Sequence, residues 1–511
     1  MRERITFVHQ PGADIDPTSL KISQDELRGP SVTTAREDRL TIAVDELPTE
    51  LARLLARFRE LSLRWTSPWA YDLIEPFVSR TSPGLHVSYT LADTKDTEAE
   101  LKLCHVLRVF GLKDCASNEN FTTHGEGQFV NLPGAILHQS LEHLSLLTSG
   151  AARELCTRND ADCQTRLEGL SGASSLDISW HTTAQVVRIS AVFSLDHRDI
   201  HVSSAAQRRT EIGILSKDSP PSQEPYELGV SGLLTVLGEN KEPTGTMFAF
   251  PSRHRSSEAS FTSQFLEPAG LHPVLQLKLS SNEVPVTDEH CAPHVYLTLP
   301  NTIFADRYQL ADKLFLASNN LTALRYTSLP VDLEAPAYAT KTWGSTVLLE
   351  LAPPPSLDDP VAAAAAATVW TAQVPLHLRY LEPSLNGTAD IEIPYPVVFW
   401  ACDSSSANAD FSNNPFDRIQ LGYDGLFGSS TVFWHVKPEP ARGDRLMSPI
   451  SVPVLKEQAA AWVGAGTAMV VAMGFAWVFW TLTSVLWRFG YGGNGHGEGE
   501  VKEGTESKKS K

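Results

Sequence analysis

The sequence has few of the features that catalysis usually leaves in a chain. It contains no G-x-S-x-G nucleophile motif, no H-E-x-x-H zinc motif and no C-x-x-C pair. Three of its sixteen histidines, His86, His294 and His377, stand in alternating strand-like patterns, which is typical of structural histidines rather than metal ligands. We therefore predict no catalytic, cofactor-binding or metal-binding residue.

Positive charge is also scarce. Lysine and arginine number 42 against 60 aspartate and glutamate residues, and the net charge is −18. Apart from the last four residues, no basic cluster offsets this charge, so nucleic acid is not expected as a partner. The first ten residues, MRERITFVHQ, lack the apolar run of about 7–15 residues that a signal peptide needs. We expect no cleaved signal.

One long stretch near the end of the sequence lacks charge altogether. Residues 459–487 contain no Asp, Glu, Lys or Arg. As a helix the stretch would be about 43 Å long, against a hydrocarbon core of about 30 Å. Tryptophans stand near both of its ends, as in interfacial belts. We predict one transmembrane helix, 459–487, followed by a tail, 488–511.

The tail ends in KKSK, which places Lys508 and Lys509 four and three residues from the terminus. This spacing resembles the di-lysine signal that cytosolic coat proteins read on resident membrane proteins of the endoplasmic reticulum. The alternative is an ordinary solvated basic end. The count of Lys and Arg on the two sides of the helix does not decide its orientation. The di-lysine reading predicts a single-pass protein of the endoplasmic reticulum membrane, with a cytosolic C-terminus and a lumenal N-terminal region.

Two other features fit a lumenal region. N-glycosylation sequons occur at Asn120, Asn320 and Asn386, although sequons also arise by chance. The six cysteines all precede the helix, as an oxidising compartment permits. Fifteen pairings are open, and reduced, buried cysteines are the alternative. Because near neighbours close small loops, the candidate disulfides are Cys104 with Cys115 and Cys156 with Cys163.

The remaining sequence favours β-structure. Residues 48–60 place leucines and a phenylalanine at helical spacing, which predicts a short amphipathic helix. Elsewhere, short β-branched or alternating runs between turn residues predict antiparallel sandwiches. The expected organisation is an N-terminal lumenal β-rich region (1–205), a segment containing a linker (206–263), a second lumenal β domain (264–455), the transmembrane helix and the tail.

Small residues recur every four positions along the predicted membrane helix, at Ala460, Gly464, Ala468, Ala472 and Ala476. Such spacing lets a second helix approach closely. Alanine is also simply common in membrane helices. The packing interpretation predicts a membrane partner.

Several stretches resemble the PIG-X family, whose longer fungal members are known as protease B non-derepressible proteins. The stretches are HVYLTLPNTIFADRYQL (294–310), VDLEAPAY (331–338), VPLHLRYLEP (374–383) and IPYPVVFWACD (393–403), with AREDRLT (35–41), SRTSPGLHVSYTL (79–91) and NPFDRIQLGYDGLFG (414–428) nearer the fungal members.

This resemblance implies a non-catalytic subunit of GPI mannosyltransferase I. Such a subunit stabilises the polytopic PIG-M-type catalytic subunit, which transfers the first mannose from dolichol-phosphate-mannose to the GPI precursor. The fungal name implies an alternative, a broader folding role in the endoplasmic reticulum. A lumenal enzyme is the third reading.

Overall fold

The structure is a computed structural model that describes residues 1–490 except 14, 95, 113–114, 125–131, 158, 206–207, 219–223, 225, 282, 287–289, 354–369 and 404–409. The chain divides into two compact units. The β-rich unit comprises Met1–Glu382 and Ala389–Val452, and the helix unit comprises Pro383–Thr388 and Pro453–Lys511. The prediction of a mostly β protein with one long apolar C-terminal helix is confirmed.

The first sheet of the β-rich unit has eleven strands among the described residues. Its order is β11-β10-β9-β1-β3-β8-β7-β4-β5-β6, with β2 paired to β3. Neighbours are antiparallel except β1 and β9, which are parallel. The strands are β1 (Arg2–His9), β2 (Lys21–Ile22), β3 (Glu26–Ala43), β4 (Phe58–Thr66), β5 (Gly84–Leu91), β6 (Ala135–Gln139), β7 (Ser175–His181), β8 (Val186–Ser203), β9 (Arg209–Asp218), β10 (Glu227–Val236) and β11 (Thr244–Pro251).

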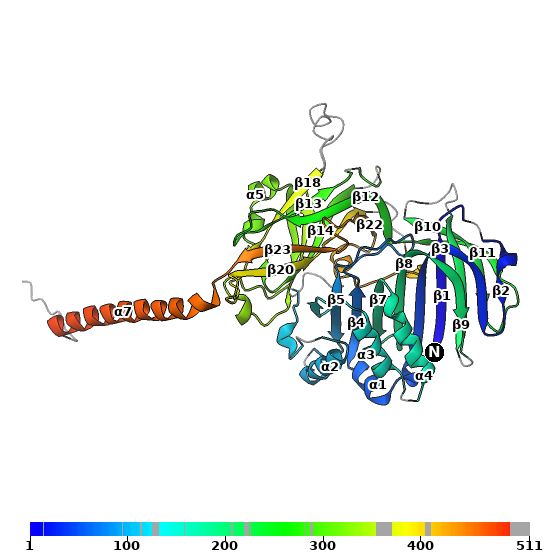
Figure 1. Ribbon diagram of the computed structural model, residues 1–511, viewed down its shortest axis with the longest axis horizontal. Coiled ribbons are helices and arrows are strands. Elements are labelled where there is room, and N and C mark those ends of the chain that lie inside the picture. Colours follow the sequence, from blue (N-terminus) through cyan, green and yellow to red (C-terminus); the bar gives the residue numbers. More distant parts are fainter. Residues whose placement is uncertain are drawn as a thin grey trace, which may run out of the picture. The chain divides into compact units, whose positions relative to one another are not determined.

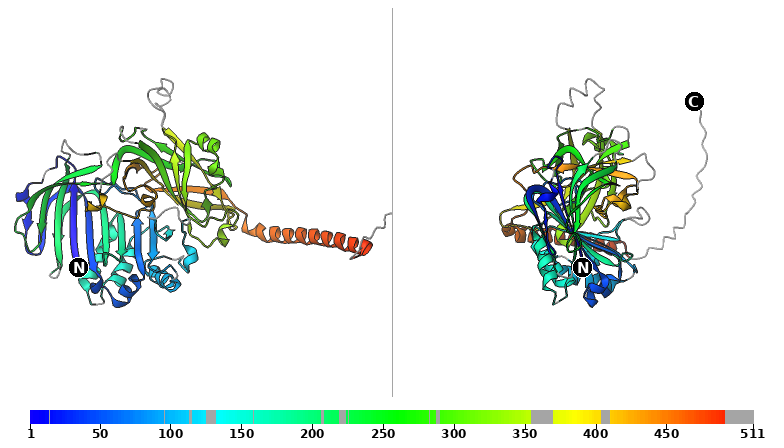
Figure 2. Two further views of the ribbon diagram at one scale, coloured as in Figure 1. Left: turned by 180° about the vertical axis from the view of Figure 1, so that it is seen from behind. Right: turned by 90° about the vertical axis from the view of Figure 1, so that its right-hand side faces the viewer.

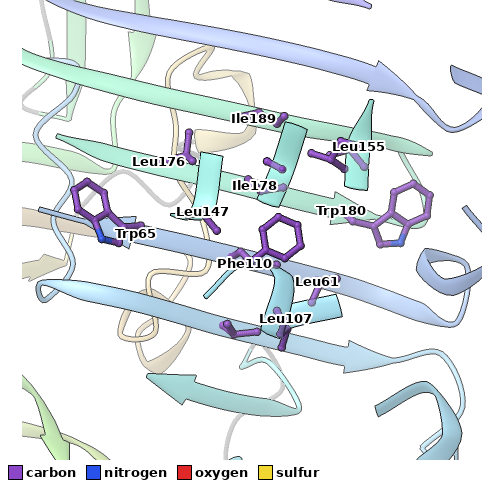
Figure 3. Close-up of a cluster of buried hydrophobic side chains, with 14 of the residues drawn as sticks. Leu61, Trp65, Leu107, Phe110, Leu147, Leu155, Leu176, Ile178, Trp180 and Ile189 are labelled. Atoms are coloured by element: carbon purple, nitrogen blue, oxygen red, sulfur yellow. The ribbon is translucent and has the colours of Figure 1, made fainter. Parts of the chain in front are cut away.

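Four helices cover one face of this sheet (Figures 1 and 2). They are α1 (Thr49–Leu55), α2 (Thr97–Val109), α3 (Ser145–Leu155) and α4 (Ala161–Glu168). Alternate residues of β4 point toward them, so that Leu61 and Trp65 join a buried cluster with Leu107, Phe110 and Leu147 (Figure 3). The opposite face carries the intervening residues of each strand, many of them polar.

The helix predicted over residues 48–60 is present but shorter. It ends at Leu55, and Phe58 is already the first residue of β4. Leu51, Leu54 and Leu55 are buried as the pattern requires. The prediction was wrong after Leu55 because the chain enters a strand with a period of two, which places Leu61, Leu63 and Trp65 in the same core.

The second sheet has eight strands in the described part of the chain, ordered β16-β17-β14-β21-β22-β12-β13-β18. Only β12 and β22 are parallel among its pairs. The strands are β12 (His254–Phe265), β13 (Val274–Leu279), β14 (His290–Pro300), β16 (Leu321–Thr327), β17 (Gly344–Leu351), β18 (Trp370–Pro375), β21 (Val397–Asp403) and β22 (Thr431–Pro438).

Two residues tie the edge strands of this sheet together. The Asn319 carbonyl accepts from the Gln373 amide of β18 (3.0 Å), and the Asn320 side chain donates to the Thr371 carbonyl (2.7 Å). Asn320 has φ 57°, a left-handed conformation that asparagine tolerates. The sheet therefore curls until β16 and β18 meet.

Shorter elements complete the unit. Two strand pairs are β15 (Ile303–Phe304) with β19 (His377–Leu378) and β20 (Thr388–Pro394) with β23 (Met447–Pro453). Among the described residues of the unit, one more α-helix is α5 (Lys313–Ser318). The 3-10 turns are η1 (Pro17–Ser19), η2 (Val44–Glu46), η3 (Asn118–Asn120), η4 (Gly169–Gly172), η5 (Gln309–Ala311), η6 (Ala337–Ala339), η7 (Phe411–Asn413) and η8 (Asp424–Leu426).

The segment expected to contain a linker, 206–263, holds β9, β10 and β11, which extend the first sheet, and most of β12. Residues 206–207, 219–223 and 225 within it lie outside the described residues. The domain boundaries themselves stay a prediction.

The helix unit contains α7 (Glu457–Phe489). Among the described residues it is the one helix long and apolar enough to cross a membrane, and none of its most apolar window is buried. It contains the predicted segment 459–487.

Candidate interaction site

One segment of the second half of the chain lies on the first sheet. This crossing segment, Asn414–Gly428, precedes β22 and touches the sheet face opposite α1–α4. The Pro415 carbonyl accepts hydrogen bonds from Arg4 of β1 (2.7 Å) and Arg39 of β3 (2.6 Å). Asp424 fixes the next turn by accepting from the amides of residues 420 and 421, each at 2.8 Å.

A buried ion-pair cluster fixes the centre of the crossing segment. Asp177 of β7 binds both Arg64 of β4 and Arg418 of the crossing segment, and all three side chains are less than 10% exposed. Burial acts to raise the pKa of the Asp177 carboxyl, but Arg418 and Arg64 outweigh it and lower that pKa. Arg64 also donates to the carbonyls of Gln420 and Ile419, each at 2.9 Å. The carboxylate thus stays ionised and fully engaged.

An aromatic anchor lies beside this cluster. Phe416 packs against Phe77 and Phe250, with ring centroids 5.8 and 5.5 Å away. The Arg4 guanidinium lies 5.1 Å from the Phe416 ring, a cation–π distance. The crossing segment therefore buries apolar surface as well as satisfying charge.

Two buried histidines meet behind the crossing segment. Nδ1 of His254 lies 3.0 Å from Nε2 of His435. Both rings pack among aromatic side chains that include Tyr423 and Phe433. Burial lowers the pKa of His435 to about 3 and that of His254 well below its usual value. These rings are neutral and act as core side chains.

The three histidines singled out from the sequence also lie in packed surroundings. The His86 ring lies tilted against that of His138, with centroids 4.7 Å apart, and is hydrogen-bonded to the Ser82 carbonyl (2.7 Å). His294 stacks on Phe399, and His377 on Phe304. Within the described ranges no three His, Cys, Asp or Glu side chains are grouped so as to hold a metal ion.

The cysteines form three disulfides. Cys104 is joined to Cys115 and Cys156 to Cys163, which are the two candidate pairs. Cys291 of β14 is joined to Cys402 of β21, directly opposite each other in the ladder. Sequence proximity could not predict the last pair, because 111 positions separate its two cysteines.

The three sequon asparagines differ in their surroundings. The Asn120 amide donates to the Lys341 carbonyl (2.9 Å), and the Asn320 amide closes the second sheet as described above. Asn386 is exposed in the turn between Ser384 and Thr388. Of the three, Asn386 is the asparagine whose side-chain amide is most directly open to solvent.

The small residues of the predicted helix-packing stripe all lie on α7, which exposes large apolar side chains around them. Added Cβ atoms at Gly464, Gly466 or Gly474 would meet nothing within 4 Å. Lys508 and Lys509 lie outside the described residues.

Sequence reasoning missed the residues that bind the crossing segment to the first sheet. Arg64, Asp177 and Arg418 come from distant parts of the chain, and no local spacing connects them. The available signal was the alternation in β4 and β7, which puts a charged residue among small polar ones on the face away from the leucines.

Within the described residues, a large β-rich unit and one candidate membrane-spanning helix are consistent with a single-pass membrane protein. A family model described as PIG-X / PBN1 matches residues 268–483. The chain is 48% identical over 493 residues to Protein pbn1 of Neurospora crassa, which covers 96% of this chain and 97% of that protein.

Two further relatives agree. Protein PBN1 of Gibberella zeae is 47% identical over 488 residues, covering 95% of this chain and 96% of its own. Protein pbn1 of Emericella nidulans is 36% identical over 512 residues, covering 94% and 95%. The chain belongs to the PIG-X / PBN1 family, as its resemblance indicated, and this membership supports a role in GPI-anchor biosynthesis.

Proposed function

We propose that this protein is a non-catalytic subunit of GPI mannosyltransferase I. In this proposal, α7 anchors it in the endoplasmic reticulum membrane, with the β-rich unit in the lumen and the C-terminus in the cytosol. It stabilises a polytopic PIG-M-type catalytic subunit, which transfers the first mannose from dolichol-phosphate-mannose to the GPI precursor.

Family membership over nearly the whole chain carries the proposal. Two structural observations support it. A membrane-embedded site for a lipid-linked sugar needs several helices, and α7 is the one candidate span within the described part of the chain. The buried carboxylates Asp177 and Glu75 are each engaged in ion pairs with buried arginines of the same unit.

Removal of the chain from cells tests the proposal. The abundance of the catalytic subunit should fall, and the unmannosylated GPI precursor should accumulate. Extra copies of the catalytic subunit alone should restore part of the mannosyl transfer, since a stabiliser is needed for amount rather than for chemistry. A catalytic subunit that stays abundant yet inactive would contradict the stabilising role.

Purification in mild detergent separates the proposal from its alternatives. A polytopic mannosyltransferase in the eluate supports a dedicated subunit, whereas assorted immature secretory proteins support a general folding role. Turnover by the isolated chain would identify an enzyme.

The orientation has its own test. Glycosidase treatment should increase the electrophoretic mobility of the chain, and Asn386→Gln should remove more of that shift than Asn120→Gln, because the Asn120 amide is already bonded to Lys341. A chain without glycan and with all cysteines reduced in cells would contradict a lumenal β-rich unit.

A further inference from the structure

A polar hollow lies on one face of the second sheet, beside the end of the crossing segment. Its volume is about 390 Å³, which is within the range of about 300–1,000 Å³ typical of small-molecule sites. Residues 287–289 and 404–409 lie outside the described residues and are not included in it. We call it the sheet hollow, and its lining includes His294, Arg325, Glu350, Ala401, Asp403 and Phe427.

Small side chains form the floor of the sheet hollow. Ala292 of β14 and Ala401 of β21 lie directly opposite each other in the ladder. Two positions further along these strands, on either side of the alanines, stand Asp403 and His294. Because alternate residues of a strand share one face of the sheet, the two methyl groups leave a depression between larger polar side chains. The floor is therefore apolar and the rim polar.

Two hydrogen-bond acceptors meet in the wall of the hollow without a donor between them. Nδ1 of His294 lies 2.9 Å from the Ala292 carbonyl, so Nδ1 carries the ring proton. Burial lowers the pKa of His294, which keeps the ring neutral and leaves Nε2 as an acceptor. His294 is only 5% exposed, yet its Nε2 makes no hydrogen bond within the described part of the chain. A carboxylate oxygen of Glu350 lies 4.0 Å from this Nε2.

The other polar groups of the rim add to this excess of acceptors. Asp403 is exposed at the end of β21, and one of its carboxylate oxygens accepts from the Thr431 hydroxyl (3.0 Å). Its second oxygen has no hydrogen bond among the described residues. Arg325 is ion-paired with Glu350 and is 55% exposed. One cation thus accompanies two carboxylates and a neutral imidazole acceptor, so the hollow suits a ligand that brings its own donors.

An aromatic side chain borders these polar groups. The Phe427 ring lies 5.0 Å from the His294 ring and is nearly perpendicular to it, at 86°. Phe427 is half-buried and lines the hollow together with the alanine floor. Apolar walls with a few convergent polar groups bind ligands that have both kinds of surface. A sugar ring is such a ligand, since its C–H groups form an apolar face and its hydroxyls point outward from the ring edge.

We propose that the sheet hollow binds a pyranose sugar. Ring hydroxyls donate to Nε2 of His294 and to the carboxylates of Glu350 and Asp403. The C–H face of the ring rests on Ala401 and Phe427. An anion is disfavoured because the unpaired groups are acceptors, and within the described ranges no three His, Cys, Asp or Glu side chains are grouped so as to hold a metal ion. The inference goes beyond the proposed function and does not depend on it.

Saturation-transfer NMR on the full chain in phosphatidylcholine nanodiscs tests this inference. The probes are the methyl α-D-pyranosides of mannose, glucose and galactose, with methylammonium and methyl phosphate as charged probes. Ala292→Leu fills the floor of the hollow, and Asp403→Asn removes a carboxylate but keeps an oxygen that can accept from Thr431. The matched controls are Ala249→Leu and Asp390→Asn, at exposed positions of β11 and β20.

Saturation should reach the ring protons of at least one pyranoside with the wild type and with both controls. It should fall at least fivefold with Ala292→Leu and at least threefold with Asp403→Asn. No transfer to any pyranoside, or transfer that both hollow variants leave unchanged, would overturn the proposal. Transfer to a charged probe but to no sugar would also overturn it. Urea unfolding shows whether each variant is folded, and Asp403→Asn decides the outcome should Ala292→Leu fail to fold.

Discussion

The disulfide between Cys291 and Cys402 should contribute more to stability than either of the other two. The perturbation is the double substitution Cys291→Ala/Cys402→Ala, which removes the bond without leaving a free thiol. The two residues face each other in adjacent antiparallel strands whose backbone ladder persists without the bond. The change therefore acts mainly on the unfolded chain.

The magnitude follows from the length of the closed loop. The bond joins residues 111 positions apart, and chain entropy predicts a loss of about 4.8 kcal/mol when it is removed. The same relation gives about 2.8 kcal/mol for the separation of 11 between Cys104 and Cys115. For the separation of 7 between Cys156 and Cys163 it gives about 2.4 kcal/mol.

The assay is pulse proteolysis of the full chain in nanodiscs across a urea series, with each disulfide removed in turn. The midpoint should fall most for the Cys291/Cys402 variant, and the two short-loop variants should lose less and resemble each other. Equal losses in all three variants, or the largest loss from the shortest loop, would refute the loop-entropy reasoning.

Three other perturbations follow from the structure. Arg418→Ala should destabilise the β-rich unit by about 3–5 kcal/mol in the same assay, since it removes one partner of a buried charge. The control Ile419→Ala, at a position 59% exposed, should change the stability little. Equal effects of the two substitutions would refute the role of the buried cluster. Acidification should destabilise the fold, because burial lowers the pKa of His86 and His435 to about 3 and of His138 to about 4. As the pH falls below about 6.5, these histidines take up protons in the unfolded chain but not in the folded chain. Each of them therefore lowers the free energy of unfolding by up to about 2 kcal/mol at pH 5. His435→Gln should reduce the loss between pH 7.5 and pH 5, and a wild type equally stable at both values would contradict this. Gly464→Leu/Ala468→Leu should weaken co-purification of a membrane partner, because leucine side chains at these positions block the close approach of a second helix without altering membrane insertion. The control Val470→Leu/Val471→Leu should not weaken it. Undiminished co-purification of the first variant would leave α7 as an anchor only.

The elements predicted from sequence were those whose signal is local. A long uncharged run predicts α7, and β-branched runs predict strands such as β14, β17 and β21. The same reasoning predicts a strand run in VPLHLRYLEP, where the structure ends β18 at Pro375 and continues only with the two-residue strand β19. Helix α2 was missed although Asp96 caps it and Ala99, Leu103 and Leu107 are buried at helical spacing, because its many polar residues mask the apolar stripe.

Pairing between distant segments was out of reach for a different reason. The parallel contact of β1 with β9 and the Cys291–Cys402 bond depend on which strands become neighbours. Nothing in a single strand specifies its neighbour beyond the need to bury one face. The Asp177 cluster is likewise a product of topology, since it brings together β4, β7 and the crossing segment.

The crossing segment bears on how the surface of this protein can be dissected. It lies inside the family-matched residues 268–483, yet Phe416 and Arg418 make their buried contacts with residues from the first 251. A fragment cut to the matched residues would leave Arg418 without its carboxylate and Phe416 without its pocket. Deletion mapping of a binding surface would then report misfolding as lost binding. Contact residues in this protein have to be found with single exposed substitutions in the intact chain.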